Sequence, residues 1–350
     1  MPLEHEVLER IELRRRRPPK FSDSQITMAH GAGGKATLTL IEGLLAPAFA
    51  IDELGDAGAV GELALTTDSF VVKPLRFPGG SIGELAVNGT VNDLAVAGAR
   101  PLALTLSLVL EEGLAADDLR AEVDAIVRAA ERVGVGVVAG DTKVVERGRC
   151  DGMYVTTTGL GRLDSRADLD VSRIRPGDRV LISGSIAEHG TAVMLARGEF
   201  ELDAPVESDT RALWPAVDAL LDAVGPSVRA MRDATRGGVA TVLNEFARAA
   251  GASVVVDEAR VPVQPAVVGA CEILGIDPMY VANEGAFVAV VAPEAADDAV
   301  AAVRSVTGCE AAVEIGEAKD DPPGMVLLQT AFGGRRVMDM LVGDPLPRIC

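Results

Sequence analysis

The first half of the chain alternates short apolar runs, typical of strands, with segments whose apolar residues recur at helical spacing. Leu, Thr and Val dominate the expected strands, and a Ser81 cap and a closing Gly134 mark the expected helices. The pattern predicts strands at 61–72 and 101–110, helices at 81–99 and 115–134, and a short buried strand at 135–140. Such alternation favours an α/β layer structure.

The second half repeats this style after a charged stretch with a Pro-Gly turn at 163–180, where we place the domain boundary. It predicts strands at 179–185, 253–258 and 286–293 and helices at 189–198, 208–224 and 237–251, the second helix behind a Ser208/Asp209 cap. In the last helix, apolar residues fall on one face: Val239, Val242, Leu243 and Phe246.

The expected fold class is therefore α/β (α+β), with two related lobes. A chain of 350 residues exceeds what one core usually organises. We expect a basic leader at 1–24, an N-terminal domain at 25–167, a C-terminal domain at 168–335 and a tail at 336–350.

The charge balance argues against nucleic acid and anionic lipid as main partners. There are 33 Lys and Arg residues against 52 Asp and Glu residues, a net charge of -19. The exception is the run Arg14–Arg17, for which we expect a flexible basic leader, with contact to an acidic partner as the alternative. No apolar segment follows the run, which argues against a twin-arginine export signal. No run approaches a membrane span, so we expect a cytoplasmic protein.

Four widely spaced cysteines fit neither a disulfide framework nor a zinc site. Cys271 lies in an apolar helical pattern, and we expect it, Cys150 and Cys309 to be structural thiols. Cys350 differs, because a chain end seldom packs into a core.

Four aspartates share one local setting, each beside glycine or at the end of an apolar segment. They are Asp68, Asp93, Asp141 and Asp233. Carboxylates gathered at strand ends require a cation, and Mg²⁺ prefers such ligands. Taken singly, each aspartate is more often a cap or turn residue.

Two glycine clusters can supply backbone amides to a phosphate. One is 30–37 (HGAGGKAT) and the other is 233–238 (DATRGG), which opens an amphipathic helix. Neither matches the P-loop or a dinucleotide-binding fingerprint. Lys35 and Arg236 add positive charge beside these loops.

Five spaced motifs carry a family resemblance: TTDSFVV, VNDLAVAGARPLALT, GDTKVV, RDATRGGVATVLNE and ANEGAF. In this order they resemble the two-domain, ATP-binding PurM-like superfamily of aminoimidazole ribonucleotide synthetase, selenophosphate synthetase and thiamine monophosphate kinase. The last residues, PRIC, make the resemblance specific to the hydrogenase maturation family HypE, the carbamoyl dehydratases. The resemblance covers about residues 25 to 350.

The resemblance implies an ATP and Mg²⁺ site. Its nucleotide-binding residues would be Gly33, Gly34, Lys35, Asp68, Asn92, Asp141, Thr142, Asp233, Thr235, Arg236, Gly237, Gly238 and Asn283, with Asp68, Asp93, Asp141 and Asp233 on the metal. We expect Cys350 to carry the substrate, Glu284 to act as general base and Lys143 to stabilise the transferred phosphoryl group.

The resemblance also implies the reaction and the partners. A carbamoyl group on the Cys350 thiol would be dehydrated to a thiocyanate at the expense of ATP, and the cyano group would become an iron ligand of nickel-iron hydrogenase. The carbamoyltransferase HypF would load the thiol and a HypC-HypD iron scaffold would receive the product. A homodimer is implied, with the N-terminal sheets packed between subunits.

Three alternatives stay open. A kinase or synthetase of small molecules within the same superfamily would not need Cys350, and the loop MAHGAGGKAT lacks the cysteine that selenophosphate synthetases place there. A nucleotide-sensing scaffold would use the tail only for docking. Finally, the terminal thiol could be inert.

Overall fold

The structure is a computed structural model that describes residues 19–51, 54–198, 204–330 and 332–343. Its contacts divide these residues into two units. One unit contains the residues up to Leu54 with the segment that begins at Leu341, and the other contains Gly55–Met340. Residues 1–18 of the predicted leader and residues 344–350 of the predicted tail lie outside the described residues.

The smaller unit is helical. After a short 3₁₀ turn at Met28–Gly31 (η1), Gly34 caps α2, and the chain stays helical through a π-helical turn; the elements are α2 (Lys35–Leu40), η2 (Ile41–Leu45) and α3 (Ala46–Phe49). A helix therefore follows directly on the first glycine cluster.

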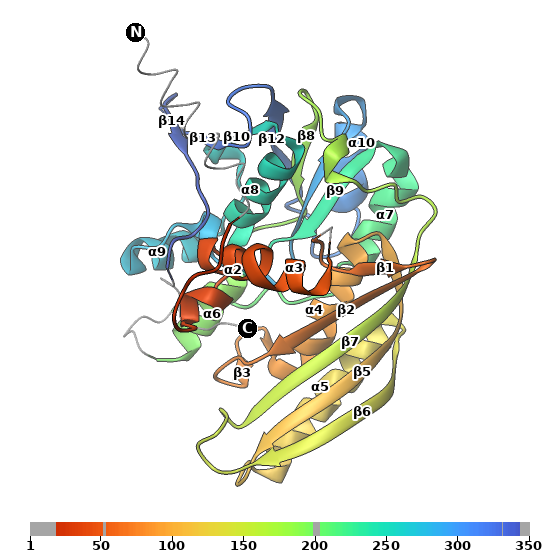
Figure 1. Ribbon diagram of the computed structural model, residues 1–350, viewed down its shortest axis with the longest axis vertical. Coiled ribbons are helices and arrows are strands. Elements are labelled where there is room, and N and C mark those ends of the chain that lie inside the picture. The colour runs from red at the N-terminus through yellow and green to blue at the C-terminus, as the bar shows by residue number, and fades with distance from the viewer. Residues whose placement is uncertain (1–18, 52–53, 199–203, 331, 344–350) are drawn as a thin grey trace. The chain divides into compact units, whose positions relative to one another are not determined.

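The larger unit begins with a five-stranded sheet, of order β1-β2-β7-β5-β6, whose inner face is covered by α4 and α5 (Figure 1). The strands are β1 (Gly58–Val60), β2 (Leu63–Phe70), β5 (Ala99–Glu111), β6 (Gly136–Val145) and β7 (Met153–Leu163); the helices are α4 (Ile82–Val96) and α5 (Ala116–Val133). Gly134 ends α5 with a left-handed φ of 77°, as expected of a glycine C-cap. A small ribbon, β3 (Arg76–Phe77) with β4 (Gly80–Ser81), precedes α4.

Helix α4 is buried on nearly all sides, with 13 of its residues inaccessible to solvent. It packs on β2 and β7 of the first sheet and also on β9 and α7 of the second layer. Its polar residues Asn88, Asn92 and Asp93 therefore lie between the two halves of the unit. A polar side chain in such a place requires a specific partner.

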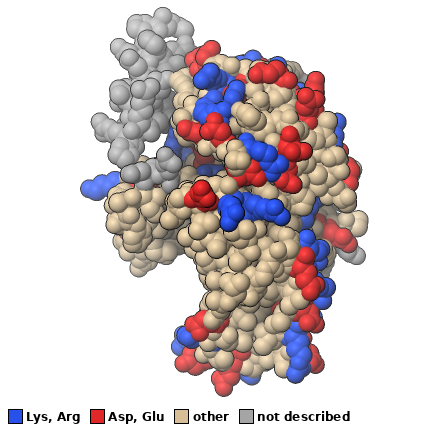
Figure 2. Space-filling model, turned by 90° about the vertical axis from the view of Figure 1, so that its right-hand side faces the viewer, with Lys and Arg blue, Asp and Glu red and all other residues tan. Residues whose placement is uncertain are grey.

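Strand β6 is longer than expected and is not buried. It pairs only with β5 among the described residues, and its residues from Gly136 to Val144 are exposed. The expectation of a buried strand at 135–140 was wrong, because strand order puts it at the edge of the sheet. Val60, Leu63, Leu65, Val138 and Val144 are exposed apolar residues of this sheet, and Figure 2 shows a broad surface without charged side chains below a band of Lys, Arg, Asp and Glu.

The second sheet has seven strands, in the order β14-β13-β10-β12-β8-β11-β9. They are β8 (Arg179–Ile182), β9 (Val228–Asp233), β10 (Ser253–Asp257), β11 (Phe287–Val291), β12 (Val313–Lys319), β13 (Val326–Gln329) and β14 (Arg335–Val337). The helices are α6 (Glu188–Ala196), α7 (Trp214–Val224), α8 (Gly238–Ala250), α9 (Pro265–Leu274) and α10 (Ala296–Arg304). The strands expected near 179–185, 253–258 and 286–293 are confirmed.

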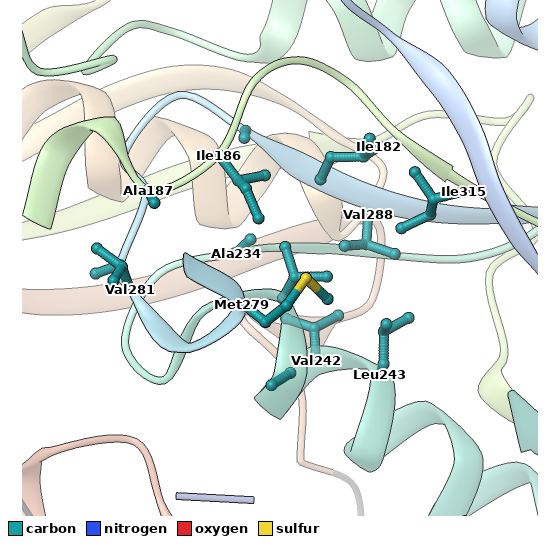
Figure 3. Packing of buried hydrophobic residues seen from close by; sticks show 14 of the residues in the cluster. Ile182, Ile186, Ala187, Ala234, Val242, Leu243, Met279, Val281, Val288 and Ile315 are labelled. Carbon is teal, nitrogen blue, oxygen red and sulfur yellow. The ribbon is translucent and has the colours of Figure 1, made fainter. Parts of the chain in front are cut away.

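The largest core lies between this sheet and α8, and Figure 3 shows Val242 and Leu243 directed toward Ile182, Val288 and other sheet residues. The four apolar residues that predicted one face of α8 are all buried. Their burial confirms the helical spacing found in the sequence and fixes the start of α8, where the candidate site begins.

One expected helix is shorter than predicted. Helix α7 begins at Trp214, with Pro215 in its first turn, so residues 208–213 are not helical. Ser208 and Asp209 are therefore not its cap. The reason is tertiary: the Asp209 carboxylate accepts the backbone N–H groups of Glu284 and Gly285 at 3.1 and 2.9 Å.

Candidate active site

The second glycine cluster forms a tight turn between β9 and α8. Asp233 is the last residue of β9, and Gly237 caps α8 with a φ of 79°. At Gly238, which also has a positive φ, an added Cβ would lie 2.5 Å from the carbonyl oxygen of Met279. Only glycine fits here. The turn Asp233–Gly238 is thus held close to the loop that follows Met279.

Glu284 is buried in that following loop, only 4% exposed. Asn283 beside it accepts the backbone N–H of Ala187 at 2.6 Å and donates to the carbonyl oxygens of Ala234 and Val281. The loop is therefore tied to the Asp233 turn.

Asn92 in α4 clamps the same loop from the other side. Its amide nitrogen donates to the carbonyl oxygens of Arg211 and Glu284 at 3.0 and 3.1 Å, and its oxygen accepts the N–H of Leu213 at 2.7 Å. The hydrogen bonds of Asn92 and Asn283 go to backbone groups that position Glu284. Direct contact of these two amides with a cofactor stays a prediction.

Asp68, Asp93 and Asp233 act on one another electrostatically although they come from β2, α4 and β9. Burial, together with the charges of Asp233 and Asp56, raises the pKa of Asp93 well above its ordinary value. Burial and the charges of Asp56 and Asp68 do the same to the pKa of Asp233. Mutual repulsion of this kind is relieved by a proton or by a cation.

Glu284 belongs to the same group. Burial and the charges of Asp233 and Asp68 raise its pKa well above the ordinary value, while Arg236 opposes the shift. Arg236 also opposes the burial that raises the pKa of Asp68. Three of the four expected metal carboxylates, the expected base and Arg236 are thus brought together. Only Asp233 lies at a strand end, whereas Asp68 is inside β2 and Asp93 inside α4.

Asp56 is a member of the cluster that the sequence analysis missed. Its carboxylate lies 3.5 Å from Nε of Arg232, which also contacts Glu245. Burial raises its pKa to about 6, against the attraction of Arg232. The local sequence LGDAG resembles an ordinary turn. Only the fold brings it to Asp93 and Asp233.

Asp141, Thr142 and Lys143 are not brought to this cluster. They lie in β6, three strand spacings from β2, which is about 14 Å at ~4.8 Å per strand. Lys143 contacts Asp141 at 2.7 Å in an exposed pair, and this hydrogen bond with that of the Thr142 N–H lowers the pKa of Asp141. Within the described residues, no three His, Cys, Asp or Glu side chains stand in a ready metal-binding arrangement.

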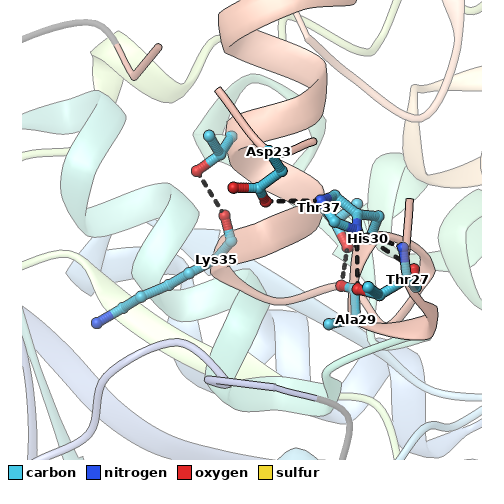
Figure 4. A network of polar contacts seen from close by, with 7 residues as sticks. Asp23, Thr27, Ala29, His30, Lys35 and Thr37 are labelled. Atoms are coloured by element: carbon cyan, nitrogen blue, oxygen red, sulfur yellow. Dashed lines mark hydrogen bonds and ion pairs between the residues drawn. The ribbon is translucent and has the colours of Figure 1, made fainter. Parts of the chain in front are cut away.

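The first glycine cluster lies in the smaller unit (Figure 4). Gly33 donates its N–H to the hydroxyl oxygen of Thr37 at 3.0 Å, and the Lys35 N–H donates to the carbonyl oxygen of Leu341 at 2.9 Å. An added Cβ at Gly34 would lie 2.5 Å from that same Leu341 oxygen. The loop therefore anchors the start of the C-terminal segment.

Cys150, Cys271 and Cys309 are free and buried, as expected for structural thiols. Burial raises the pKa of each of them. None of the three is therefore suited to act as an exposed thiolate. The expected carrier, Cys350, lies outside the described residues.

Comparison with known proteins defines the class. The AIR synthase related N-terminal domain matches residues 54–163, and the AIR synthase related C-terminal domain matches residues 175–328. The α/β fold expected from the sequence is thereby confirmed as the two-domain PurM-like fold of this class.

The chain belongs to the HypE family of carbamoyl dehydratases, enzymes of hydrogenase maturation. It is 46% identical over 337 residues to carbamoyl dehydratase HypE of Rhodobacter capsulatus, covering 94% of this chain and 99% of that protein. A HypE structure solved as a HypE-HypF complex has a TM-score of 0.82 at 42% identity and covers 86% of this chain and 99% of that chain. A HypE structure in complex with ATP has a TM-score of 0.79 at 41% identity and covers 93% and 100%.

The helices do not include a membrane span. In the part of the chain that the structure describes, none is both long and apolar enough to cross a bilayer.

Proposed function

We propose that this chain uses ATP to dehydrate a carbamoyl group on Cys350 to a thiocyanate, the source of cyanide ligands for nickel-iron hydrogenase. The observation that carries the proposal is the buried Glu284, whose carboxyl is within electrostatic range of Asp68 and Asp233. A carboxyl with a raised pKa suits a proton acceptor that works near neutral pH. Family membership supports the same reaction class.

The chemistry needs two activations. The amide oxygen attacks the γ-phosphorus of ATP, which releases ADP and leaves the oxygen as part of a good leaving group. Loss of the N–H protons and cleavage of the C–O bond then release inorganic phosphate and form S–C≡N. Glu284 takes a proton from nitrogen, and Lys143 stabilises the transferred phosphoryl group.

We propose Asp68, Asp93 and Asp233 as ligands of Mg²⁺, because they are carboxylates of the kind that Mg²⁺ prefers and the charges of Asp233 and Asp68 act on Asp93. Among the described residues they do not yet stand in a ready metal-binding arrangement. When bound, Mg²⁺ would screen the phosphate charge. We propose Asp141 as a fourth ligand. For the nucleotide we propose the backbone of Gly33, Gly34, Gly237 and Gly238, together with Lys35, Asn92, Thr142, Thr235, Arg236 and Asn283. A relative solved in complex with ATP supports nucleotide binding.

The test is intact mass spectrometry of the carbamoylated full chain. Addition of Mg-ATP should remove about 18 Da, the mass of water, from the C-terminal peptide. A Cys350→Ser chain, which cannot carry the thiocarbamate, serves as the control. Unchanged mass of the carbamoylated wild type under these conditions would contradict the proposal.

The role of Glu284 is tested by Glu284→Gln, which keeps the size of the side chain and removes its basicity. We expect nucleotide binding to persist while the 18 Da loss, about one water, disappears. If the variant dehydrates at the wild-type rate, another group is the base.

The proposed partners follow the family. HypF would load the thiol, as the solved HypE-HypF complex of a relative supports, and a HypC-HypD scaffold would take the cyano group. We place the protein in the cytoplasm and keep domain boundaries near residues 24, 167 and 335. The run Arg14–Arg17 lies outside the described residues and receives no role.

We also propose a homodimer in which the first sheets of two chains pack together. The exposed apolar residues of this sheet favour burial, and the place of Lys143 in β6, three strands from Asp68 in β2, leaves the site of one chain without this lysine. Lys143 and Asp141 would then serve the partner's site.

Mixing two inactive variants tests this dimer. Lys143→Ala chains and Glu284→Gln chains should each fail alone, yet a re-associated mixture should recover about a quarter of the sites, because half the dimers pair the two intact residues once. A mixture as inactive as its parents would refute a shared site.

A further inference from the structure

A cavity that the proposed reaction does not use lies in the larger unit. It has a volume of about 580 Å³ and lies between the start of α6 and the loop before α7. Its polar lining comes from Glu188, Glu207, Asp209, Arg211 and Gln264. Its apolar lining comes from Pro78, Ala204, Pro205 and Val206.

One carboxylate oxygen that lines the cavity receives no hydrogen bond from the described residues. Oε1 of Glu188 is inaccessible to solvent and has no hydrogen-bond partner among the described residues. Burial and the charge of Asp209 raise the pKa of Glu188 to about 7, against Arg211 and a hydrogen bond from Gln264. A buried carboxylate oxygen without a donor is costly, so this oxygen favours a guest that brings an N–H group.

The net charge of the lining is negative. Three carboxylates face one guanidinium, that of Arg211. A Cβ added at Gly184 or Gly308 would lie 2.9 or 3.1 Å from a terminal nitrogen of Arg211. The guanidinium of Arg211 therefore packs closely against these two glycines. Glu310 lies within electrostatic range of the same guanidinium. With three carboxylates in the lining, the cavity favours a positively charged guest, while Nε of Arg211 is a buried donor without a hydrogen-bond partner among the described residues.

The cavity shares a wall with the candidate active site. Asp209 lines the cavity, and its carboxylate accepts the backbone N–H groups of Glu284 and Gly285. Asp209 thus lies between the backbone of Glu284 and the cavity. A peptide whose end reaches Glu284 can therefore place a nearby side chain in it.

We propose that this cavity binds the guanidinium of Arg348, two residues before Cys350, when the thiol is at Glu284. The inference rests on the proposed function of Cys350, which like Arg348 lies outside the described residues. Two extended residues span about 7 Å, and the arginine stem adds a similar reach. The apolar stem suits Pro78, Pro205 and Val206, and the planar head suits the carboxylate of Glu188.

The test uses full-length chains whose carbamoyl load is measured by mass before Mg-ATP is added, so that loading does not affect the result. Under single-turnover conditions, Arg348→Gln and Glu188→Gln should each slow dehydration about 10- to 100-fold, the range for a hydrogen bond to a charged group. The double variant should be no slower than the slower single variant, because both remove one interaction. Glu207→Gln, at an exposed position of the lining, is the matched control and should stay near wild type.

Exchanging the charges of Glu188 and Arg348 distinguishes a direct interaction between them from a purely structural role of Glu188. The pair Glu188→Arg with Arg348→Glu should recover part of the rate lost by either change alone. Additive effects of the two glutamine variants, or wild-type rates in both, would overturn the proposal. So would slowing by serine substitution of Arg14–Arg17 together with a wild-type rate for Arg348→Gln, which would make the leader the guest. Failure of the wild type to lose water would instead refute the proposed function.

Discussion

The contribution of the Asn92 hydrogen bonds to the free energy of unfolding can be measured with the variant Asn92→Ala. Asn92 is 1% exposed and makes three hydrogen bonds to the backbone of Arg211, Leu213 and Glu284. At a net value of about 1 kcal/mol per bond, Asn92→Ala should cost about 3 kcal/mol, and more if the backbone groups stay dry. The cost falls on the two loops that position Glu284.

Asn88 offers a matched control one turn earlier in α4. It is 2% exposed and makes one hydrogen bond, to the Thr210 hydroxyl at 3.3 Å. Asn88→Ala should therefore cost about 1 kcal/mol, leaving a difference of about 2 kcal/mol between the variants.

Urea titration followed by tryptophan fluorescence provides the assay, because Trp214 is the one tryptophan in the chain and directly follows Leu213. The free energy of the transition that it reports is compared between the two variants at equal slope. Equal losses in Asn92→Ala and Asn88→Ala would refute the reasoning that hydrogen-bond number sets the cost.

Two further predictions follow from the same site. Gly285→Ala should destabilise the larger unit by at least about 3 kcal/mol, since its Cβ would overlap the carbonyl oxygen of Asp209. Gly269→Ala, in α9 where an added Cβ meets no atom within 4 Å, should be neutral or slightly stabilising. Equal urea midpoints for the two variants would contradict this. Because the cluster carboxylates have raised pKa values, nucleotide-free stability should fall as pH rises above about 4, through their folded-state pKa values. Mg²⁺ should consequently raise the melting temperature increasingly as the pH rises above about 4, and a rise that does not depend on pH would refute the assignment. Asp141→Asn removes one of the four proposed ligands, one whose carboxyl has a lowered pKa, so it should leave this pH dependence in place.

Local pattern predicted the elements well where one face of a helix is buried against a sheet. The spacing of Val239, Val242, Leu243 and Phe246 was sufficient for α8, and the glycine at 134 for the end of α5. Local pattern did not predict the start of α7. Asp209 accepts a hydrogen bond from Glu284, which lies 75 residues away in the sequence, and no local pattern contains such a contact.

The site was predicted in part for the same reason. Motifs pointed to Asp68, Asp93, Asp233 and Glu284, and the fold brings these together. Asp56 was missed because its sequence resembles a turn. Asp141 has the same local setting as the others, but strand order, which the sequence does not reveal, puts it on an edge strand.

The position of β6 at the edge of the sheet has a consequence for the turnover of each chain. Among the described residues, strand β6 is paired on one side and carries Lys143 in an exposed position. If the site is shared as proposed, a single chain would lack the lysine that stabilises the transferred phosphoryl group. Turnover per chain would then fall on dilution, and the abundance of the protein in its cell would itself set the rate of the proposed dehydration.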